Sequence, residues 1–474
     1  QPIDYVNPFI GTGGHGHTYP GVSMPFGMVQ LSPDTRLEGW DGCGGYHYSD
    51  SIIYGFSHTH LSGTGISDYG DVLLMPTTGE IQLTNGVKLS KENNLQINQS
   101  GYSSKFSHDN EIAKAGYYQV FLDDYKINVE LTSSIRAGFH RYTFPKGENA
   151  NVILDLKHRD KLLDYKINVV DSQTIIGLRQ SSEWARDQRI YFTIKFSIPF
   201  LETTYNDEKN VVGLSFGKIS GPLEVKASIS AVDNIGSNNN LSEIINLSFE
   251  EVKQKAQKQW NKELNKIQIT SNSKTKKEIF YTALYHSSLN PNTYNDLNGN
   301  YLGMDFKKHK TDDNHYTIFS LWDTFRATHP LFTITNVERT NEFIRTLLRQ
   351  YKDGGRLPIW ELAANYTDCM IGYHAIPVIV DAYVKGIRDW DVNLALEAMI
   401  KSAQSNTFGL EAYKKNGFIK ASDEPESVSK NLEYAYDDWC IAIMADSLGQ
   451  DSIAKTFYER AQYYKNLYDP ESGF

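Results

Sequence analysis

The chain has little cysteine, no excess of positive charge and no long apolar run. Cys43, Cys369 and Cys440 are too few and too scattered for a disulfide framework or a zinc site with CxxC spacing. The net charge is −10 at pH 7, and no basic stripe of the kind that nucleic-acid binders carry is present. No apolar run approaches the ~18–20 residues of a transmembrane helix. We therefore expect no nucleic-acid partner and no membrane span.

Aromatic residues are abundant, with 30 Tyr, 22 Phe and 7 Trp. They gather with Gly, His, Ser and Asp in the segment from Trp40 to Gly70, which fits neither a simple core strand nor an amphipathic helix. Glycine lets the backbone approach a ligand closely, and Tyr, Trp and His offer flat apolar rings with one polar tip. Hydroxyl-rich ligands such as sugars need both, so this segment indicates a carbohydrate site. For most of the aromatic residues, a Tyr-rich β surface and an aromatic core is an equally good interpretation.

The first half of the chain, residues 1–240, has the pattern of antiparallel β-structure. Ile190, Phe192, Ile194 and Phe196 alternate with polar or smaller residues, which is the period of a half-buried strand. Short strand candidates of this kind recur between Gly, Asn and Asp clusters. The spacing predicts a large β-sandwich.

A shift in composition at residues 236–248 marks the expected end of the sandwich. A polar helix from Phe249 to Asn265 follows, so we assign residues 241–270 to linker helices. Thr275 and Glu278 have the spacing of a capping box at the start of the next helix. Residues 271–474 then form a helical domain.

Apolar stripes recur at helical spacing in this second half. One runs from Phe343 to Tyr351 and stops at Gly354-Gly355, and another contains Leu432, Tyr436 and Trp439. The sequence ends in a turn-like Asp-Pro-Glu-Ser-Gly segment, and a toroid of paired helices needs more of them. We therefore expect a longer polypeptide, a cleaved partner segment or an inactive fragment. The start at Gln1 without methionine fits an exported, processed protein, or a chain cut at that place for expression.

Two loop segments of the first half could bind a ligand. Residues 7–21 are too rich in glycine for regular structure and lack the Gly-Lys-Ser/Thr of a phosphate loop. His58 and His60 are two residues apart, so on a strand both face one side. Zinc ligation fits that spacing but lacks a third ligand, and we favour a hydrogen-bonding pair at a pocket rim or domain interface.

Three segments of the second half carry polar and aromatic groups together. Trp322 and Asp323 offer a stacking face beside an acceptor, although Asp323 could equally cap a helix and Trp322 lie in a core. Glu361 and His374 belong to a polar loop region that precedes an apolar helix. Glu433 and Asp437 are four residues apart and share one helix face, as an acid–base pair, a metal site or a solvated surface.

Six segments in the same order resemble glycoside hydrolase family 92, a family of bacterial, calcium-dependent, inverting exo-α-mannosidases. The segments are NPFIGTGGHGHTYPGVSMPFGMVQLSPDT, GWDGCGGYHYSD, GFSHTHLSGTG, SLWDTFRATHPL, GGRLPIWELAANYTDCMIGYHA and SVSKNLEYAYDDW. The resemblance implies an N-terminal β-sandwich and an (α/α)6 toroid, of which only the first part is in this chain. It implies hydrolysis of terminal α-mannose from N-glycans or mannan, in the periplasm or outside the cell.

The resemblance also implies site residues. Asp323, in the Trp-Asp-Thr-Phe-Arg motif, corresponds to a carboxylate that holds mannose hydroxyls, with Trp322 beside it, and Trp40 corresponds to a sugar-contacting aromatic. His58, His60, Glu361, His374 and Asp437 match motif positions without an assigned role. Calcium is expected on the mannose hydroxyls at C2 and C3, a role that suits a hard cation.

The motifs that carry the family's acid, base and most calcium ligands are absent. We find no His-Glu-Gly-Asn and no Gly-Asn-Asp-Asp segment, so the acid and base are expected beyond Phe474. Two other interpretations stay open: a glycan-binding fragment that does not hydrolyse, and a disaccharide phosphorylase of similar architecture.

Overall fold

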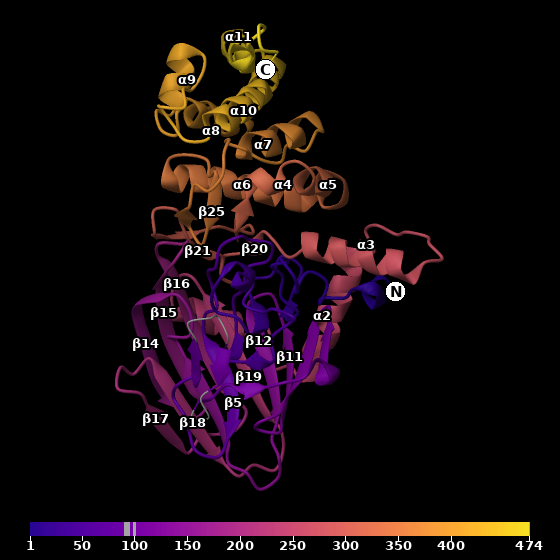
Figure 1. The fold of residues 1–474 in the computed structure, drawn as a ribbon, viewed down its shortest axis with the longest axis vertical. Helices are drawn as coiled ribbons and strands as arrows, with labels where there is room; N and C mark the ends of the chain where they lie inside the picture. The colour runs from indigo at the N-terminus through magenta and orange to yellow at the C-terminus, as the bar shows by residue number, and fades with distance from the viewer. Residues whose placement is uncertain (90–94, 98–100, 474) are drawn as a thin grey trace. The chain divides into compact units, whose positions relative to one another are not determined.

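The computed structural model of the chain describes residues 1–89, 95–97 and 101–473 (Figure 1). It contains two compact units, Gln1–Tyr301 and Leu302–Phe474. The first consists mainly of strands, and the second mainly of helices.

Two large antiparallel sheets form the body of the first unit. The strands of the seven-stranded sheet, in spatial order, are β1 (Val22–Ser23), β2 (Gln30–Asp34), β4 (Gly55–Ser57), β5 (Leu73–Thr78), β13 (Ala150–Asp155), β18 (Val211–Gly217) and β17 (Glu202–Tyr205). Those of the eight-stranded sheet are β14 (Lys161–Asp171), β15 (Thr174–Ser182), β16 (Gln188–Phe196), β19 (Leu223–Ser230), β12 (Ala137–Thr143), β11 (Ile127–Ser133), β10 (Tyr117–Leu122) and β9 (Glu111–Lys114).

Several short elements complete the first unit. They are the strand pairs β3 (Ile52–Ile53) with β8 (Ser104–Lys105) and β6 (Val87–Leu89) with β7 (Leu95–Ile97), the strand β20 (Asn292–Thr293), and the 3₁₀ turns η1 (Pro2–Tyr5), η2 (Trp40–Gly42) and η3 (His108–Asn110).

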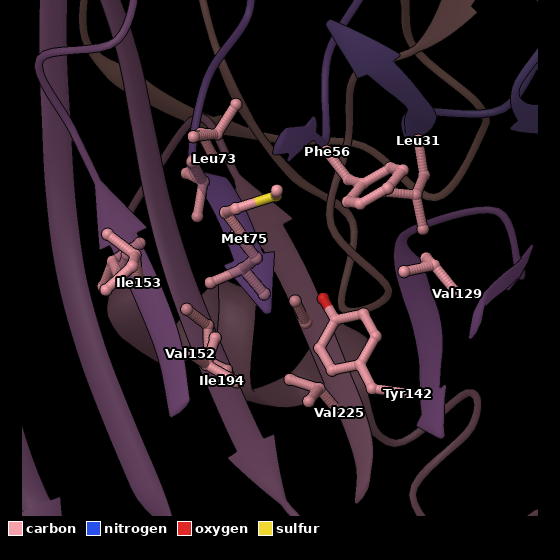
Figure 2. Close-up of a cluster of buried hydrophobic side chains, with 14 of the residues drawn as sticks. Leu31, Phe56, Leu73, Met75, Val129, Tyr142, Val152, Ile153, Ile194 and Val225 are labelled. Atoms are coloured by element: carbon pink, nitrogen blue, oxygen red, sulfur yellow. The ribbon is translucent and has the colours of Figure 1, made fainter. Parts of the chain in front are cut away.

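The core of the first unit lies between the two sheets, and side chains from both sheets meet there. Met75 and Val152 come from the seven-stranded sheet, while Ile194, Val225 and Tyr142 come from the eight-stranded sheet (Figure 2). Alternation along the strands places every second residue in this core. The predicted β-sandwich is therefore confirmed, and the predicted strand around Ile194 is part of it.

The asparagine-rich segment forms a helix, where a domain boundary was predicted. It is α1 (Asn234–Leu241), and Asp233 caps it by accepting a hydrogen bond from the Gly236 amide at 2.7 Å. Asn240 is fully buried and donates to Asp296 and to the Ile229 carbonyl, both at 2.8 Å. Tertiary hydrogen bonds thus outweigh the weak helix propensity of asparagine.

Two longer helices follow in the first unit. The predicted polar helix is confirmed as α2 (Phe249–Leu264), with Ser248 and Glu251 forming its capping box. The predicted cap at Thr275 is wrong, because α3 (Lys274–Ser287) begins earlier and Ser273 accepts from the Lys276 amide. Glu278 instead accepts a hydrogen bond from Asn7 at 2.9 Å.

Helices joined by loops with short strands form the second unit. The helices are α4 (Leu321–Thr324), α5 (Thr328–Thr335), α6 (Val337–Gly354), α7 (Ala375–Val384), α8 (Val392–Ala403), α9 (Leu410–Asn416), α10 (Ser427–Ser447), α11 (Asp451–Arg460) and the 3₁₀ helix η4 (Tyr463–Leu467). The strands are β22 (Lys308–Lys310), β23 (Tyr316–Thr317), β24 (Phe319–Ser320), β25 (Trp360–Leu362) and β26 (Asn365–Tyr366), and β21 (Asn300–Leu302) crosses the division between the units.

The stripe of α6 behaves as predicted, and that of α10 does not. Phe343 and Leu347 are fully buried, and α6 ends at Gly355 in the left-handed conformation. In α10, Leu432, Tyr436 and Trp439 are instead 42–49% exposed. The buried face of α10 carries Asp437 and Asp438, whose charges are paired with His374 and Arg460. Paired charges can be buried, so hydrophobicity alone misassigned the faces of this helix.

The predicted fold class, a β-sandwich followed by a helical domain, is confirmed. The three-part division at residues 240 and 270 stays a prediction, because the structure groups α1, α2 and α3 with the sandwich in one compact unit. Among the described residues, no helix has the length and apolar character needed to cross a bilayer.

Candidate active site

A histidine held between two carboxylates is the centre of the polar cluster in the second unit. His374 precedes α7, and Glu433 and Asp437 lie one helical turn apart on α10, next to α7 (Figure 1). The distance from His374 Nδ1 to Asp437 Oδ1 is 2.9 Å, and that from Nε2 to Glu433 Oε2 is 3.3 Å. The shared helix face predicted for the two carboxylates is thus the face that holds His374.

The two carboxylates favour the protonated ring. Burial disfavours a charged imidazole, but the negative charges of Asp437 and Glu433 outweigh it and raise the pKa of His374. Asp437 is fully buried and also accepts from the Tyr373 amide at 2.8 Å. The buried carboxylate therefore orients both the ring and the backbone that carries it.

A pocket of about 520 Å³ lies against this cluster. Glu433 faces it together with Arg326, and the two form an ion pair at 2.9 Å. Phe325 also lines the pocket and stacks on the His374 ring, with centroids 4.1 Å apart. The pocket wall thus combines aromatic faces with charged groups, as a site for a polar ligand requires. Its remaining lining residues are Pro330, Pro377, Asp381, Leu432 and Tyr436.

A second buried carboxylate with satisfied oxygens lies at β25. Glu361 accepts hydrogen bonds from the amides of Ala364 and Ile318, at 2.7 and 3.1 Å, and from the Thr317 hydroxyl at 2.9 Å. Burial raises the pKa of Glu361 to about 7 in spite of these donors. A carboxyl whose pKa lies near neutrality can exchange a proton at the pH at which an enzyme works.

The backbone around Glu361 is strained. Ile318, Ala363, Ala364, Asp368 and Met370 all have positive φ, between 49° and 70°. Side chains other than glycine rarely adopt this conformation, and each instance costs about 1–3 kcal/mol. Such strain concentrates at binding and catalytic sites, so these segments are candidates for ligand contact.

Asp323 and Trp322 lie at the short helix α4. Asp323 is exposed and accepts from the Ser320 hydroxyl at 2.5 Å. The N-cap position of α4 belongs to Ser320, so the alternative that Asp323 caps this helix is wrong. The Trp322 indole nitrogen is buried and has no hydrogen-bond partner among the described residues. An accessible carboxylate and a donor without a partner are available for ligand binding.

A further buried carboxylate in the second unit stands beside the cluster. Asp438 pairs with Arg460 at 2.8 Å and accepts from the Tyr373 hydroxyl at 2.7 Å. Burial raises the pKa of Asp438 to about 7, although the Arg460 charge opposes this. The neighbouring residues Asp437 and Asp438 of α10 thus bind the side chains of His374 and Tyr373, respectively.

His58 and His60 lie inside the first unit, at 0% and 1% exposure. His58 bonds to the Val72 carbonyl at 2.7 Å and to His140 at 3.0 Å, and burial lowers its pKa to about 4. His60 lies between the Gln30 carbonyl at 2.8 Å and Asp34 at 3.2 Å. This burial favours a structural role for both rings, and their predicted contact with substrate stays a prediction.

Trp40 has the opposite placement. It starts the turn η2 of the first unit and is 60% exposed, against 44% for Trp439. An exposed indole face beside glycine-rich loops suits stacking on a sugar ring.

Two family models cover the chain. The glycosyl hydrolase family 92 N-terminal domain matches residues 5–255, and the family 92 catalytic domain matches residues 236–474. The chain belongs to glycosyl hydrolase family 92. Its sequence resemblance to that family is thereby confirmed.

Solved structures of the family share the fold. A family 92 α-mannosidase from Bacteroides thetaiotaomicron, also solved in complex with mannoimidazole, matches 100% of this chain with 37% identity and a TM-score of 0.94. An inverting family 92 mannosidase from the same organism matches with 31% identity and a TM-score of 0.88. Each match spans 66% of the chain of the solved mannosidase.

A curated relative is an uncharacterized secreted glycosidase from Arthroderma benhamiae. It is 25% identical over 98% of this family 92 chain, and the match spans 62% of the relative's length. The chain is therefore shorter than its relatives by about a third or more.

Calcium, which the family resemblance implies, was sought as a cluster of metal-binding side chains among the described residues. No group of three or more His, Cys, Asp or Glu side chains that could hold a metal ion occurs in this part of the family 92 chain. Calcium prefers six to eight oxygen ligands.

The structure brings His374 and Asp437 together, and it adds residues that the sequence prediction omitted. Arg326 and Phe325 complete the cluster, and both belong to the same motif as Asp323. Their place in the same short motif was a usable signal. Tyr373 carried no signal, since its role depends on the partners of its backbone and hydroxyl.

Proposed function

We propose that this chain is part of an exo-acting, inverting α-mannosidase that removes terminal α-linked mannose from N-glycans or mannan oligosaccharides. One observation carries the proposal: the whole chain matches an α-mannosidase with 37% identity and a TM-score of 0.94. The complex of that mannosidase with mannoimidazole supports mannose as the sugar.

The side chains of this chain supply the binding part of such a site. In the proposal, the exposed Asp323 of the second unit accepts sugar hydroxyls, with Trp322 beside it. The exposed Trp40 of the first unit is a separate candidate for stacking on a sugar ring. Asp437 and Glu433 hold the His374 ring, on which the pocket-lining Phe325 stacks. Glu361 accepts a hydrogen bond from the Ala364 amide and so supports the strained backbone at that residue.

Inversion requires a general acid and a general base about 6.5–9.5 Å apart, so that a water fits between base and sugar. We assign neither role to a residue of this chain. The prediction that both follow Phe474 in a longer polypeptide belongs to the proposal.

Calcium dependence also belongs to the proposal. A hard cation prefers oxygen ligands and could hold two sugar hydroxyls. The described residues contain no group of three His, Cys, Asp or Glu side chains, and the proposal places further oxygen ligands elsewhere in the enzyme. We likewise propose an exported protein that acts in the periplasm or outside the cell, in line with the name of its secreted relative.

The test is mannose release by the full-length polypeptide from a panel of α-linked mannobioses. We expect release that EGTA stops and that added calcium restores. Release of mannose 1-phosphate only in the presence of inorganic phosphate would favour a phosphorylase instead. Binding of mannosides without release would favour a glycan-binding protein.

A further inference from the structure

An acceptor without a partner lies beside the exposed Trp40 in the first unit. His17 is only 7% exposed, and its ring centroid lies 4.8 Å from that of Trp40 in an edge-on arrangement. A Cβ on Gly65 would stand 2.6 Å from the Trp40 ring, so the indole packs directly on the glycine backbone. The position of the Trp40 ring is therefore fixed by two neighbours.

The hydrogen bonds of His17 define its tautomer. Nδ1 lies 2.6 Å from the Thr64 carbonyl oxygen, which only accepts, so Nδ1 carries a proton. Nε2 is buried and has no hydrogen-bond partner among the described residues. In the neutral ring this nitrogen presents a lone pair beside Trp40, and a buried polar atom of this kind is costly without a partner.

Asp41 supplies a second acceptor at the same place. Its Oδ1 accepts from His15 Nδ1 at 2.9 Å and lies 3.8 Å from His17 Nε2, which exceeds hydrogen-bond length. The hydrogen bond from His15 lowers the pKa of Asp41, so the carboxylate is charged at neutral pH. Two acceptors that face each other repel, unless a group with hydrogen-bond donors lies between them.

We propose that His17 Nε2 and the Asp41 carboxylate form an acceptor pair for two neighbouring hydroxyls of a sugar stacked on Trp40. The inference rests on the proposed function and adds to it the residues that accept hydrogen bonds from the sugar hydroxyls. A sugar supplies both features of the cluster: a face for the indole and adjacent O–H donors for the two acceptors.

The test is a titration of the full-length enzyme with methyl α-mannoside and its monodeoxy analogues. In His17→Asn the amide can still donate to the Thr64 carbonyl, while the Nε2 acceptor is lost. We expect affinity to fall about three- to tenfold in His17→Asn, and about tenfold or more in Asp41→Asn. One monodeoxy analogue that binds wild type weakly should lose no further affinity in His17→Asn, because its missing hydroxyl is the partner of Nε2.

The matched control is His47→Asn. His47 has the same 7% exposure, but its two ring nitrogens already bond to Ser49 at 2.8 Å and to the Gly14 carbonyl at 3.0 Å. We expect this variant to bind the analogues with the same order of affinities as the wild type. His17→Gln, which restores a polar group near Nε2, should recover part of the affinity, and unfolding midpoints show whether each variant is folded.

The outcomes separate the two proposals. A wild-type enzyme that hydrolyses α-mannosides while His17→Asn binds every analogue like wild type overturns the acceptor pair and leaves the mannosidase intact. A wild-type enzyme that cleaves another glycoside overturns the mannosidase, and the monodeoxy analogues of that glycoside then test the pair. A folded enzyme that binds no sugar overturns both.

Discussion

Replacing Asp437, which is buried and paired with His374, should destabilise the fold by an amount that depends on pH. Asp437 accepts two hydrogen bonds, from His374 Nδ1 at 2.9 Å and from the Tyr373 amide at 2.8 Å, and it is fully buried. Asp437→Asn removes the charge and leaves an NH₂ group that can donate but not accept. Breaking a buried ion pair by removing one partner costs about 3–5 kcal/mol, and losing a buried hydrogen bond alone costs about 1–3 kcal/mol.

The pH dependence follows from the raised pKa of His374. A histidine whose folded pKa exceeds its unfolded value stabilises the fold fully below the unfolded pKa, and this contribution is lost as pH rises through the folded pKa. Asp437→Asn should therefore destabilise the second unit by about 3–5 kcal/mol at about pH 6 and by only about 1–3 kcal/mol at about pH 9.

Urea unfolding of the full-length protein, followed by tryptophan fluorescence, measures this difference. Trp439 lies on the same helix, close in sequence to Asp437, and reports on it. Asp446→Asn is the control, because Asp446 is an exposed residue of α10 and its replacement should change stability by less than about 0.5 kcal/mol. An equal loss of stability at both pH values, or no loss, would refute the reasoning.

Two further predictions concern the other carboxylates of the second unit. Because the folded pKa of Glu361 is about 7 and lies above its ordinary value, stability should fall as pH rises from about 4.5 to 7, by about 3 kcal/mol at most, and Glu361→Gln should flatten that slope in unfolding titrations. A slope unchanged in the variant contradicts the assignment. Asp323→Ala should keep the unfolding midpoint, since Asp323 is exposed, but should lower kcat/KM for α-mannosides about 100-fold. Wild-type kinetics in this variant would remove Asp323 from the site.

Much of the fold follows from local patterns in the sequence. The period-two alternation around Ile194 predicted β16, and the stripe from Phe343 with its terminal glycine predicted α6. These elements bury one regular face, so hydrophobicity alone reveals them. The helix α1 could not be found in this way, because the buried bonds of Asn240 to Asp296 and Ile229 stabilise it, and these partners are remote or belong to a strand.

The site was predictable only in part, for a related reason. The four-residue spacing of Glu433 and Asp437 indicated a shared face, yet it could not show that His374, 63 residues from Asp437, lies between them. Likewise the spacing of His58 and His60 suggested a hydrogen-bonding pair at a pocket rim or domain interface, and it could not show that both rings are buried and bond to Val72, His140, Gln30 and Asp34. Both placements depend on contacts between residues far apart in the sequence, and no local pattern reveals such contacts.

The measurement that tests the central claim most directly is the time course of hydrolysis of an α-linked mannobiose by the full-length enzyme, followed by proton NMR of the anomeric signals. The account predicts that mannose is released and that its first anomer is β, which converts to the equilibrium mixture later. Release of α-mannose first, or intact mannobiose after prolonged incubation with folded enzyme and calcium, would contradict it.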